Sequence, residues 1–373
     1  MKTRQFWYPL PERLIAQHPA ERRGTERMMV LHRATGVVEH RHIADIVEYL
    51  DANDLLVVND TKVFPARLIG KWEDSDGTVE VLMVNAAPVD GVETPTMAVD
   101  GLIWNCILGS GRKCREGQVA VFGPEGELKV RLLKPLSGIG MWRVEFICDR
   151  PLMELLDEFG HTPVPPYVKR EGTAVEERED RERYQTIYAR EIGSVAAPTA
   201  GLHFTPEIFA ALEAKGVKRV AVTLHVGPGT FRPVKAEEIE DHQMDFEAFT
   251  VGAEAAEAIN ECKRRGGRVV CVGSTTVRTL ETVASRPKDE TDGAETDDRP
   301  LIVPGTGASN IFIYPPYKFR VCDVMLTNFH LPQSTLLMMI SALAGRERVL
   351  CAYHLAVQKN YMFFSYGDCM LIV

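Results

Sequence analysis

Three histidines lie at the ends of apolar segments, where an imidazole can exchange protons with a bound ligand. They are His203 in GSVAAPTAGLHFT (193–205), His225 after VAVTL, and His330 in the polar corner TNFH. An imidazole titrates near neutral pH, which suits general acid or base catalysis. A structural histidine is the alternative for each. Asp368 joins these catalytic candidates, because an acid inside an apolar terminal run needs either a partner in the core or a role in a site.

A glycine and three hydroxyl residues join the apolar run RVVCV to the helical pattern VRTLETVA. They are Gly273, Ser274, Thr275 and Thr276. Free N–H groups and the positive end of a helix would receive an anion or a carboxylate. An ordinary helix cap is the alternative, and the spacing is not that of a nucleoside-triphosphate loop. We predict that the three hydroxyl residues bind substrate.

Further polar side chains follow buried strands or stand near glycine turns. Asn59 and Asp60 end the apolar run LLVVN, and Asn328 ends another. Open α/β proteins bind ligands just beyond such strand ends. Arg232 and Arg278 suit a carboxylate or a phosphate, although either arginine can instead pair with a buried acid. We predict that these five residues bind substrate.

The loop 193–205 is the stretch around which the chain is organised. Its small side chains bury little apolar area, and its glycines allow close approach of another molecule. Thr205, Pro206 and Glu207 then give the signal for a helix start. A small-residue turn between two crossing elements is the alternative. A ligand-binding loop is our interpretation, with Thr199 and Gly201 as substrate-binding residues.

The composition changes between residues 66 and 149, where short alternating segments are separated by glycine turns. This pattern is typical of a small antiparallel barrel or sandwich. We therefore predict an α/β main domain with a mixed sheet, formed by residues 1–65 and 150–373, and a smaller inserted all-β barrel domain, formed by residues 66–149.

The chain has 373 residues, a net charge of −9 and eight cysteines without a C-x-x-C pair. These features favour reduced thiols and a cytoplasmic protein, and we find no signal-like or membrane-spanning segment. Six acids lie within 289–298, so the remainder of the chain carries only −3. Net charge therefore does not exclude a nucleic-acid partner.

Basic residues gather in two places, near residue 22 and in the proline-rich and charged segment 161–183, which we expect to be an exposed arm. Solvated charge is the alternative for both places. The candidates for contacts with RNA phosphates are Arg22, Arg23, Lys169, Arg170 and Arg183.

Six motifs occur in one order along the chain: NDTKVFPARL, GSVAAPTAGLHFT, TLHVGPGTFRPV, VGSTTVRTLE, TNFHLPQSTLLMMISALAG and FFSYGD. In these motifs the chain resembles the S-adenosylmethionine:tRNA ribosyltransferase-isomerases of queuosine biosynthesis. The resemblance extends from LIAQHP to the C-terminus. It implies a monomer with an α/β domain and a β-barrel domain.

The resemblance also implies a reaction. The ribosyl part of S-adenosylmethionine, a co-substrate, is transferred and isomerised onto 7-aminomethyl-7-deazaguanine at the wobble position in the anticodon loop of tRNA. The products are epoxyqueuosine-tRNA, adenine and methionine. This scheme needs no metal and no prosthetic group. Phe363, Phe364 and Tyr366 could stack on adenine or on the wobble base, with an aromatic core as the alternative.

The chain departs from the family pattern at several positions. The family usually has histidine where this chain has Asp245, an aliphatic residue at Pro228 and arginine at Met362. The acidic segment 289–298 is longer than expected. The replacement by Asp245 leaves no second histidine to act in that motif.

Two other classes of function fit parts of the sequence. A phosphoribosyl-type transferase would use 273–276 for a phosphate, but it predicts a metal-chelating acid pair beside that loop, and Glu281 is the nearest acid. A noncatalytic tRNA-binding protein would give no role to the loop 193–205 and its histidine. Detection of adenine released from S-adenosylmethionine would distinguish the three classes of function.

Overall fold

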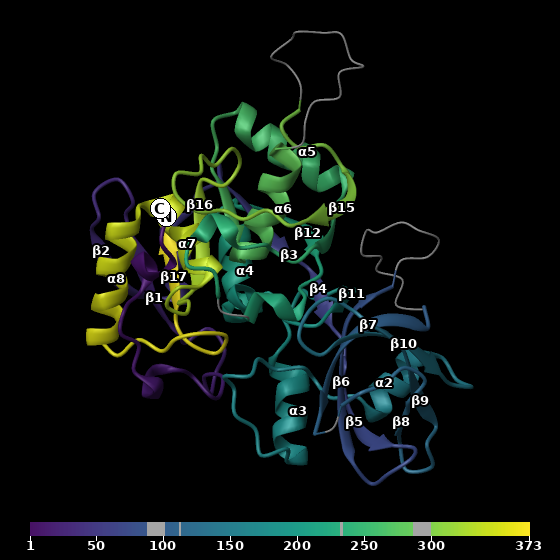
Figure 1. Cartoon of the computed structure of the whole chain (residues 1–373). Coiled ribbons are helices and arrows are strands. Elements are labelled where there is room, and N and C mark those ends of the chain that lie inside the picture. The colour runs from purple at the N-terminus through teal and green to yellow at the C-terminus, as the bar shows by residue number, and fades with distance from the viewer. Residues whose placement is uncertain (88–100, 112, 232–233, 286–299) are drawn as a thin grey trace.

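The computed structural model describes residues 1–87, 101–111, 113–231, 234–285 and 300–373. Arg232 and the acidic segment 289–298 lie outside the described residues. The chain forms a large α/β body and a smaller β-barrel, and helix α3 (Ala174–Arg183) stands beside the barrel (Figure 1). This architecture confirms the predicted fold class, an α/β part with a mixed sheet and an all-β barrel.

The main sheet has nine strands in the described part of the chain. In spatial order they are β15 (Gly305–Ser309), β13 (Glu247–Val251), β12 (Lys218–Leu224), β3 (Leu55–Asn59), β14 (Val269–Val272), β16 (Val324–Asn328), β17 (Cys369–Ile372), β1 (Arg27–Leu31) and β2 (Val38–His42). The central strands β12, β3, β14 and β16 are parallel to one another. Antiparallel pairing begins at β13 on one side and at β17 on the other, so the sheet is mixed.

Strand β3 shows why helices cover both faces of this sheet. Leu55 and Val57 point into one core cluster, whereas Leu56 and Val58 point into another. Successive side chains of a strand alternate between faces, so a continuous apolar run must be buried on both. One cluster includes residues of α5 (Ala253–Arg264), α6 (Gly273–Ser285), α7 (Thr335–Ala344) and α8 (Arg346–Gln358), and the other includes residues of α1 (Ile46–Tyr49) and α4 (Pro206–Ala214).

The barrel closes through antiparallel pairs around the ring β10-β7-β6-β5-β8-β9. Its strands are β5 (Arg67–Trp72), β6 (Thr78–Ala86), β7 (Ile103–Ser110), β8 (Val119–Phe122), β9 (Leu128–Pro135) and β10 (Met141–Ile147). The following helix α2 (Leu152–Phe159) packs its leucines into the barrel core. The division of the chain into domains at residues 65/66 and 149/150 stays a prediction.

Shorter elements connect these parts. Strands β4 (Thr61–Val63) and β11 (Glu191–Ser194) form a parallel pair. The 3-10 helices are η1 (Thr3–Phe6), η2 (Glu12–Leu14), η3 (Ile43–Asp45), η4 (Thr199–His203), η5 (Pro228–Phe231) and η6 (Ile239–Asp241). Within the described ranges no helix is both long and apolar enough to cross a membrane, and no group of three potential metal-ligating side chains is found.

Helix α2 supplies a test of the barrel core. Leu155 is buried in that core, whereas Asp157 on the same helix is exposed. Replacing Leu155 with alanine should lower the free energy of unfolding by about 2–5 kcal/mol, because the lost apolar contacts leave a cavity. Asp157→Ala is the matched control and should change this free energy by less than about 0.5 kcal/mol. Equal denaturation curves for the two variants would contradict the packing of α2 in the barrel.

Candidate active site

A pocket opens at the carboxyl ends of the parallel strands β14 and β16. It encloses about 700 Å³ of space, part of it open to solvent. Its lining consists of residues 197–200, 273–275, 327–331 and 364–365, with Tyr167, Val226, Ser334 and Leu336. The fold therefore brings together the loop 193–205, the hydroxyl cluster and the polar corner, three stretches that are far apart in the sequence.

The hydroxyl cluster forms the first turn of α6, which follows β14 directly. Gly273 permits this junction with a φ of 82°. Ser274 and Thr275 line the pocket, and the hydroxyl of Thr275 is buried without a hydrogen-bond partner among the described residues. Thr276 instead donates its hydroxyl to the carbonyl of Val272, the last residue of β14. The N–H groups at the start of α6 and the hydroxyl of Thr275, which has no partner among the described residues, thus lie at the wall of the pocket.

Arg278 lies one turn further along α6 and does not line the pocket. Its guanidinium forms a buried ion pair with Glu247 at the start of β13. Its Nε and Nη2 have no hydrogen-bond partner in the described part of the chain. The structure thus places Arg278 behind the pocket, paired with a buried acid.

The polar corner after β16 supplies an imidazole and an amide. Nε2 of His330 lies 2.7 Å from Oγ1 of Thr327, and the backbone N–H of His330 donates to the hydroxyl of Tyr353. Burial lowers the pKa of His330 to about 3, so its imidazole is neutral at pH 7. Nδ2 of Asn328 donates to the carbonyl of Phe364 over 2.8 Å, while Oδ1 has no partner among the described atoms.

Aromatic rings form one wall of the pocket. Phe364 has a φ of 73°, a backbone conformation that is costly for a bulky residue and is often found at functional sites. Its ring stacks on Tyr167 with the ring centroids 4.4 Å apart, and the hydroxyl of Tyr167 lies 2.6 Å from that of Ser365. The described lining contains no Asp, Glu, Lys or Arg. A ligand therefore meets hydroxyls, amides, N–H groups and aromatic faces.

His225 lies in a different cavity, beside Asp60. Its Nδ1 is 2.8 Å from the hydroxyl of Thr61, which in turn donates to Ser194. Burial lowers the pKa of His225 to about 4. Asp60 accepts from Thr223 and pairs with Arg190, and burial raises the pKa of Asp60.

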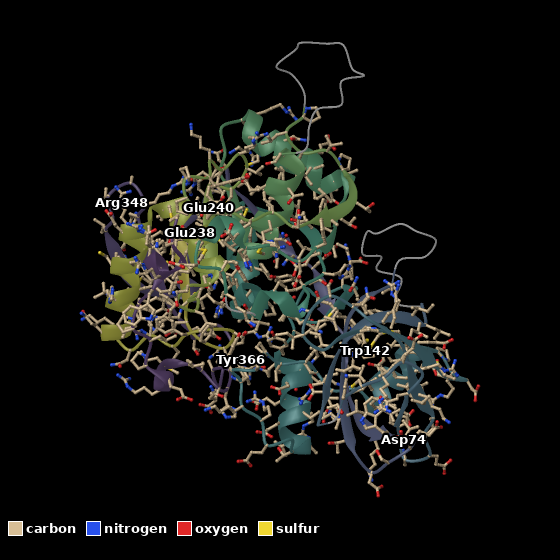
Figure 2. All side chains as sticks on the ribbon, in the orientation of Figure 1. Asp74, Trp142, Glu238, Glu240, Arg348 and Tyr366 are labelled. Carbon is tan, nitrogen blue, oxygen red and sulfur yellow. The ribbon has the colours of Figure 1, made fainter. Side chains whose placement is uncertain are left out.

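His203 and Tyr366 line a narrow crevice on the other side of η4 from the pocket. His203 is 2% exposed, and its Nδ1 is 3.8 Å from a carboxylate oxygen of Glu26. The hydroxyl of Tyr366 donates to Asp180 of α3, and Figure 2 shows Tyr366 between the α/β body and α3. The three predicted histidines thus lie in three separate cavities.

Several other predicted site residues hold the backbone. The side chain of Asn59 joins β3 to β12 through both backbone groups of Leu224. Asp368 accepts the backbone N–H groups of Arg27 and Met362, and burial raises the pKa of Asp368. Among the loop residues, Thr199 lines the pocket. At Gly201 a Cβ would lie 2.0 Å from the hydroxyl oxygen of Tyr188, so Gly201 serves close packing.

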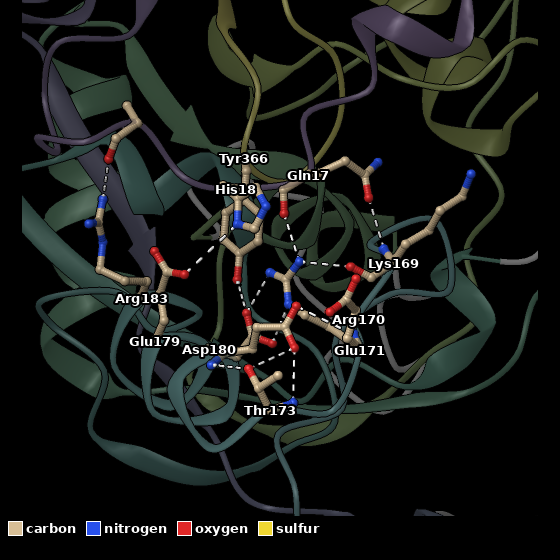
Figure 3. A network of polar contacts seen from close by, with 12 residues as sticks. Gln17, His18, Lys169, Arg170, Glu171, Thr173, Glu179, Asp180, Arg183 and Tyr366 are labelled. Atoms are coloured by element: carbon tan, nitrogen blue, oxygen red, sulfur yellow. Dashed lines mark hydrogen bonds and ion pairs between the residues drawn. The ribbon is translucent and has the colours of Figure 1, made fainter.

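The predicted RNA-contacting residues differ in how they are held (Figure 3). Arg170 is largely buried and forms a bidentate pair with Asp180. Lys169 is exposed and pairs with Glu12, and Arg22 is exposed. Arg23 and Arg183 donate to backbone carbonyls at the crevice. The segment 161–183 is therefore not a free arm, because Arg170 is anchored on Asp180 and residues 174–183 form α3.

Sequence reasoning missed Tyr167 and Ser365 as parts of the pocket. Tyr167 follows the proline-rich stretch HTPVPP and was expected on an exposed arm, and no local signal announces that its ring meets Phe364. Among the departures from the family pattern, Asp245 lies beside Gly229 and Met362 contributes its backbone N–H to Asp368. Neither residue lines the pocket in the described structure.

The whole chain is similar to known proteins. The family model described as queuosine biosynthesis protein matches residues 3–372. A protein of Caldanaerobacter subterraneus subsp. tengcongensis is 46% identical over 373 residues, and one of Acetivibrio thermocellus is 45% identical over 372 residues, with 100% of each chain covered. Both relatives are named S-adenosylmethionine:tRNA ribosyltransferase-isomerase.

A solved structure shows the same relationship. The crystal structure of S-adenosylmethionine tRNA ribosyltransferase from Thermotoga maritima is 34% identical, with a TM-score of 0.51. The match covers 99% of this chain and 100% of that one. Together with the family model and the relatives, it shows that this chain belongs to the queuosine biosynthesis protein family, the family of the S-adenosylmethionine:tRNA ribosyltransferase-isomerases.

Proposed function

We propose that this protein transfers and isomerises the ribosyl part of S-adenosylmethionine onto 7-aminomethyl-7-deazaguanine at the tRNA wobble position. The products are epoxyqueuosine-tRNA, adenine and methionine. Membership of the family supports the reaction. The observation that supports the pocket as its site is the pair of unpaired polar atoms beside the start of α6, Oγ1 of Thr275 and Oδ1 of Asn328. Buried polar atoms normally have partners, so two unpaired atoms in one pocket indicate a ligand site.

The chemistry of S-adenosylmethionine matches this lining. Its carboxylate would accept hydrogen bonds from the N–H groups at the start of α6 and from Thr275, where the helix dipole favours negative charge. Its ammonium group would donate to Oδ1 of Asn328. Its sulfonium and adenine would meet the rings of Tyr167 and Phe364, because aromatic faces attract cations and stack on purines.

The reaction needs a base beside the sulfonium, a proton donor to the departing adenine, and a deprotonated hydroxyl to close the epoxide. We assign the proton-accepting role to His330, because it is the one histidine in the described lining of the pocket and its imidazole is neutral. A neutral imidazole also avoids repulsion of the sulfonium. His203, His225 and Asp368 do not line this pocket. The scheme uses S-adenosylmethionine as a co-substrate, and we propose a monomer acting in the cytoplasm.

The first test of this function is the release of adenine. The protein is mixed with S-adenosylmethionine and an anticodon stem-loop that carries 7-aminomethyl-7-deazaguanine. Adenine should appear in step with modification of the RNA, because both come from one transfer. The same stem-loop with guanine is the control and should release none. Equal release with both stem-loops, or none with the modified one, would refute the proposed reaction.

Two neighbouring threonines test the pocket. Thr275→Val removes the unpaired hydroxyl and keeps the shape of the side chain, so it should weaken binding of S-adenosylmethionine by about three- to thirtyfold. Thr276→Val removes a hydroxyl that donates to the backbone carbonyl of Val272 and does not line the pocket, so it should leave that affinity unchanged. Calorimetric titration measures both. If the two variants bind equally well, the amino-acid part of the ligand is held elsewhere.

The buried imidazole of His330 predicts how stability depends on pH. Its pKa of about 3 in the folded protein lies below the ordinary value of 6.5, so the unfolded chain takes up the proton first. The stability that comes from neutral His330 is thus fully present above pH 6.5 and is lost as pH falls toward 3. Between about pH 6 and 4, His330→Gln should reduce the slope of unfolding free energy against pH by up to about 1.4 kcal/mol per unit. Parallel curves for wild type and variant would show that His330 is not buried as described.

A further inference from the structure

A crevice lies behind the wall of the pocket. This wall consists of residues 197–203 and the turn 364–366. Residues 197–200 face the pocket, whereas Leu202 and His203 face the crevice, and Ser365 lines both. The crevice is narrow and open to solvent, and its other side is formed by Pro19, Arg23, Glu26 and Arg183. A group bound there would thus be separated from the pocket by a single turn of chain.

Unpaired polar atoms concentrate around this crevice. In the described structure both ring nitrogens of His203 and Nη1 of Arg23 are buried without hydrogen-bond partners. The hydroxyls of Thr186 and Tyr188, which do not line the crevice, also have no partner among the described residues. Both side chains pack against Gly201 in the wall, and Tyr188 lines the cavity of His225. These groups are donors or can act as donors. Such a cluster is costly for the folded protein unless a ligand with acceptor atoms satisfies it.

The charges at the crevice favour an anion. Nη2 of Arg23 donates to the backbone carbonyls of Arg183 and Gln185, and Nη2 of Arg183 donates to that of Ala20. These contacts hold two guanidinium groups at one small opening, and Glu26 and Glu182 are the carboxylates that act on Arg23. Glu26 is the one acid that lines the crevice in the described chain, and it already accepts from Gly24 and faces His203. Cations therefore outnumber carboxylates.

We propose that this crevice binds the backbone phosphate of the tRNA nucleotide that reacts, with Arg23 and Arg183 as its cationic donors and His203 as a further hydrogen-bond donor. The proposal rests on the proposed function. Guanidinium groups bind phosphate oxygens strongly and with defined geometry. The usual paired contact of arginine with a purine needs the N7 acceptor, which a 7-deazapurine lacks. With its phosphate in the crevice, the nucleotide can extend its base past Ser365 into the pocket.

The test combines changes in the RNA with changes in the protein. Anticodon stem-loops are prepared with one uncharged methylphosphonate at each position around the wobble nucleotide, and their affinities are measured without S-adenosylmethionine. For wild type, one position should lower the affinity by about ten- to hundredfold, the loss expected for a charge-assisted contact. Arg23→Gln should lose a similar factor with the natural RNA. With the RNA that carries the methylphosphonate at that sensitive position, Arg23→Gln should bind only slightly more weakly than it binds the natural RNA.

Further variants guard against a change in folding. Arg183→Gln should likewise lose little further affinity when the sensitive phosphate is replaced, which is the coupling expected of a direct contact. Arg23→Lys should restore part of the affinity. Arg348→Gln, at an exposed position of α8 (Figure 2), is the control and should keep the wild-type pattern. The slope of log affinity against log salt should fall by about 0.7 in Arg23→Gln, as for one lost phosphate contact with a single strand.

The outcomes separate this proposal from the proposed function. If Arg23→Gln and Arg183→Gln keep wild-type affinity, or if the methylphosphonate penalties simply add to theirs, the crevice does not hold a phosphate. Adenine release by the same preparations would then still support the ribosyl transfer. If adenine is never released while the coupling is present, the reaction is wrong and the RNA site stands.

Discussion

Burial of the central parallel strands on both faces is the constraint on which the rest of the structure depends. Residues of β3 alternate between two apolar clusters, and neither face can accept a polar ligand. Polar chemistry is therefore confined to the ends of the strands. At the carboxyl ends of β14 and β16 the fold places a helix start, an amide and an imidazole in the lining of one pocket. The short junction at Gly273 brings the N–H groups of α6 directly to this edge.

The sequence predicts this edge well because its signals are local. Glycine and hydroxyl residues after an apolar run, or an asparagine and a histidine after another, mark strand ends and helix starts in any α/β protein. The barrel is equally local, because short alternating segments with glycine turns follow one another. The local signals do not show which side of the sheet a residue at a strand end faces, because this depends on how the strand is paired with its neighbours. His225 and Val226 are neighbours, yet His225 faces one cavity and Val226 faces the pocket. Tyr167 and Asp180 could not be predicted either, since their partners come from remote segments.

The C-terminal turn shows how buried polar groups fix an unfavourable backbone conformation. Phe364 adopts its left-handed conformation between two side chains that hydrogen-bond to the backbone of the turn. Asn328 binds the carbonyl of Phe364 from the end of β16, and Asp368 closes the turn by accepting the N–H of Met362. An acid just before β17 and an asparagine at the end of β16 thus act together on an aromatic wall. Their contribution to the site is rigidity, which holds the ring of Phe364 against Tyr167.

The wall shared by the pocket and the crevice has a thermodynamic consequence. Residues 197–200 and 364–365 form one side of the pocket, and the adjoining residues 202–203 and 365–366 form one side of the crevice. If a ligand in one cavity shifts this wall, it changes the affinity of the other cavity for its own ligand. Linkage then requires the effect to be reciprocal, with the same factor whichever ligand arrives first. If S-adenosylmethionine and the tRNA bind on opposite sides of this wall as proposed, the binding of each can change the affinity for the other without a direct contact between them.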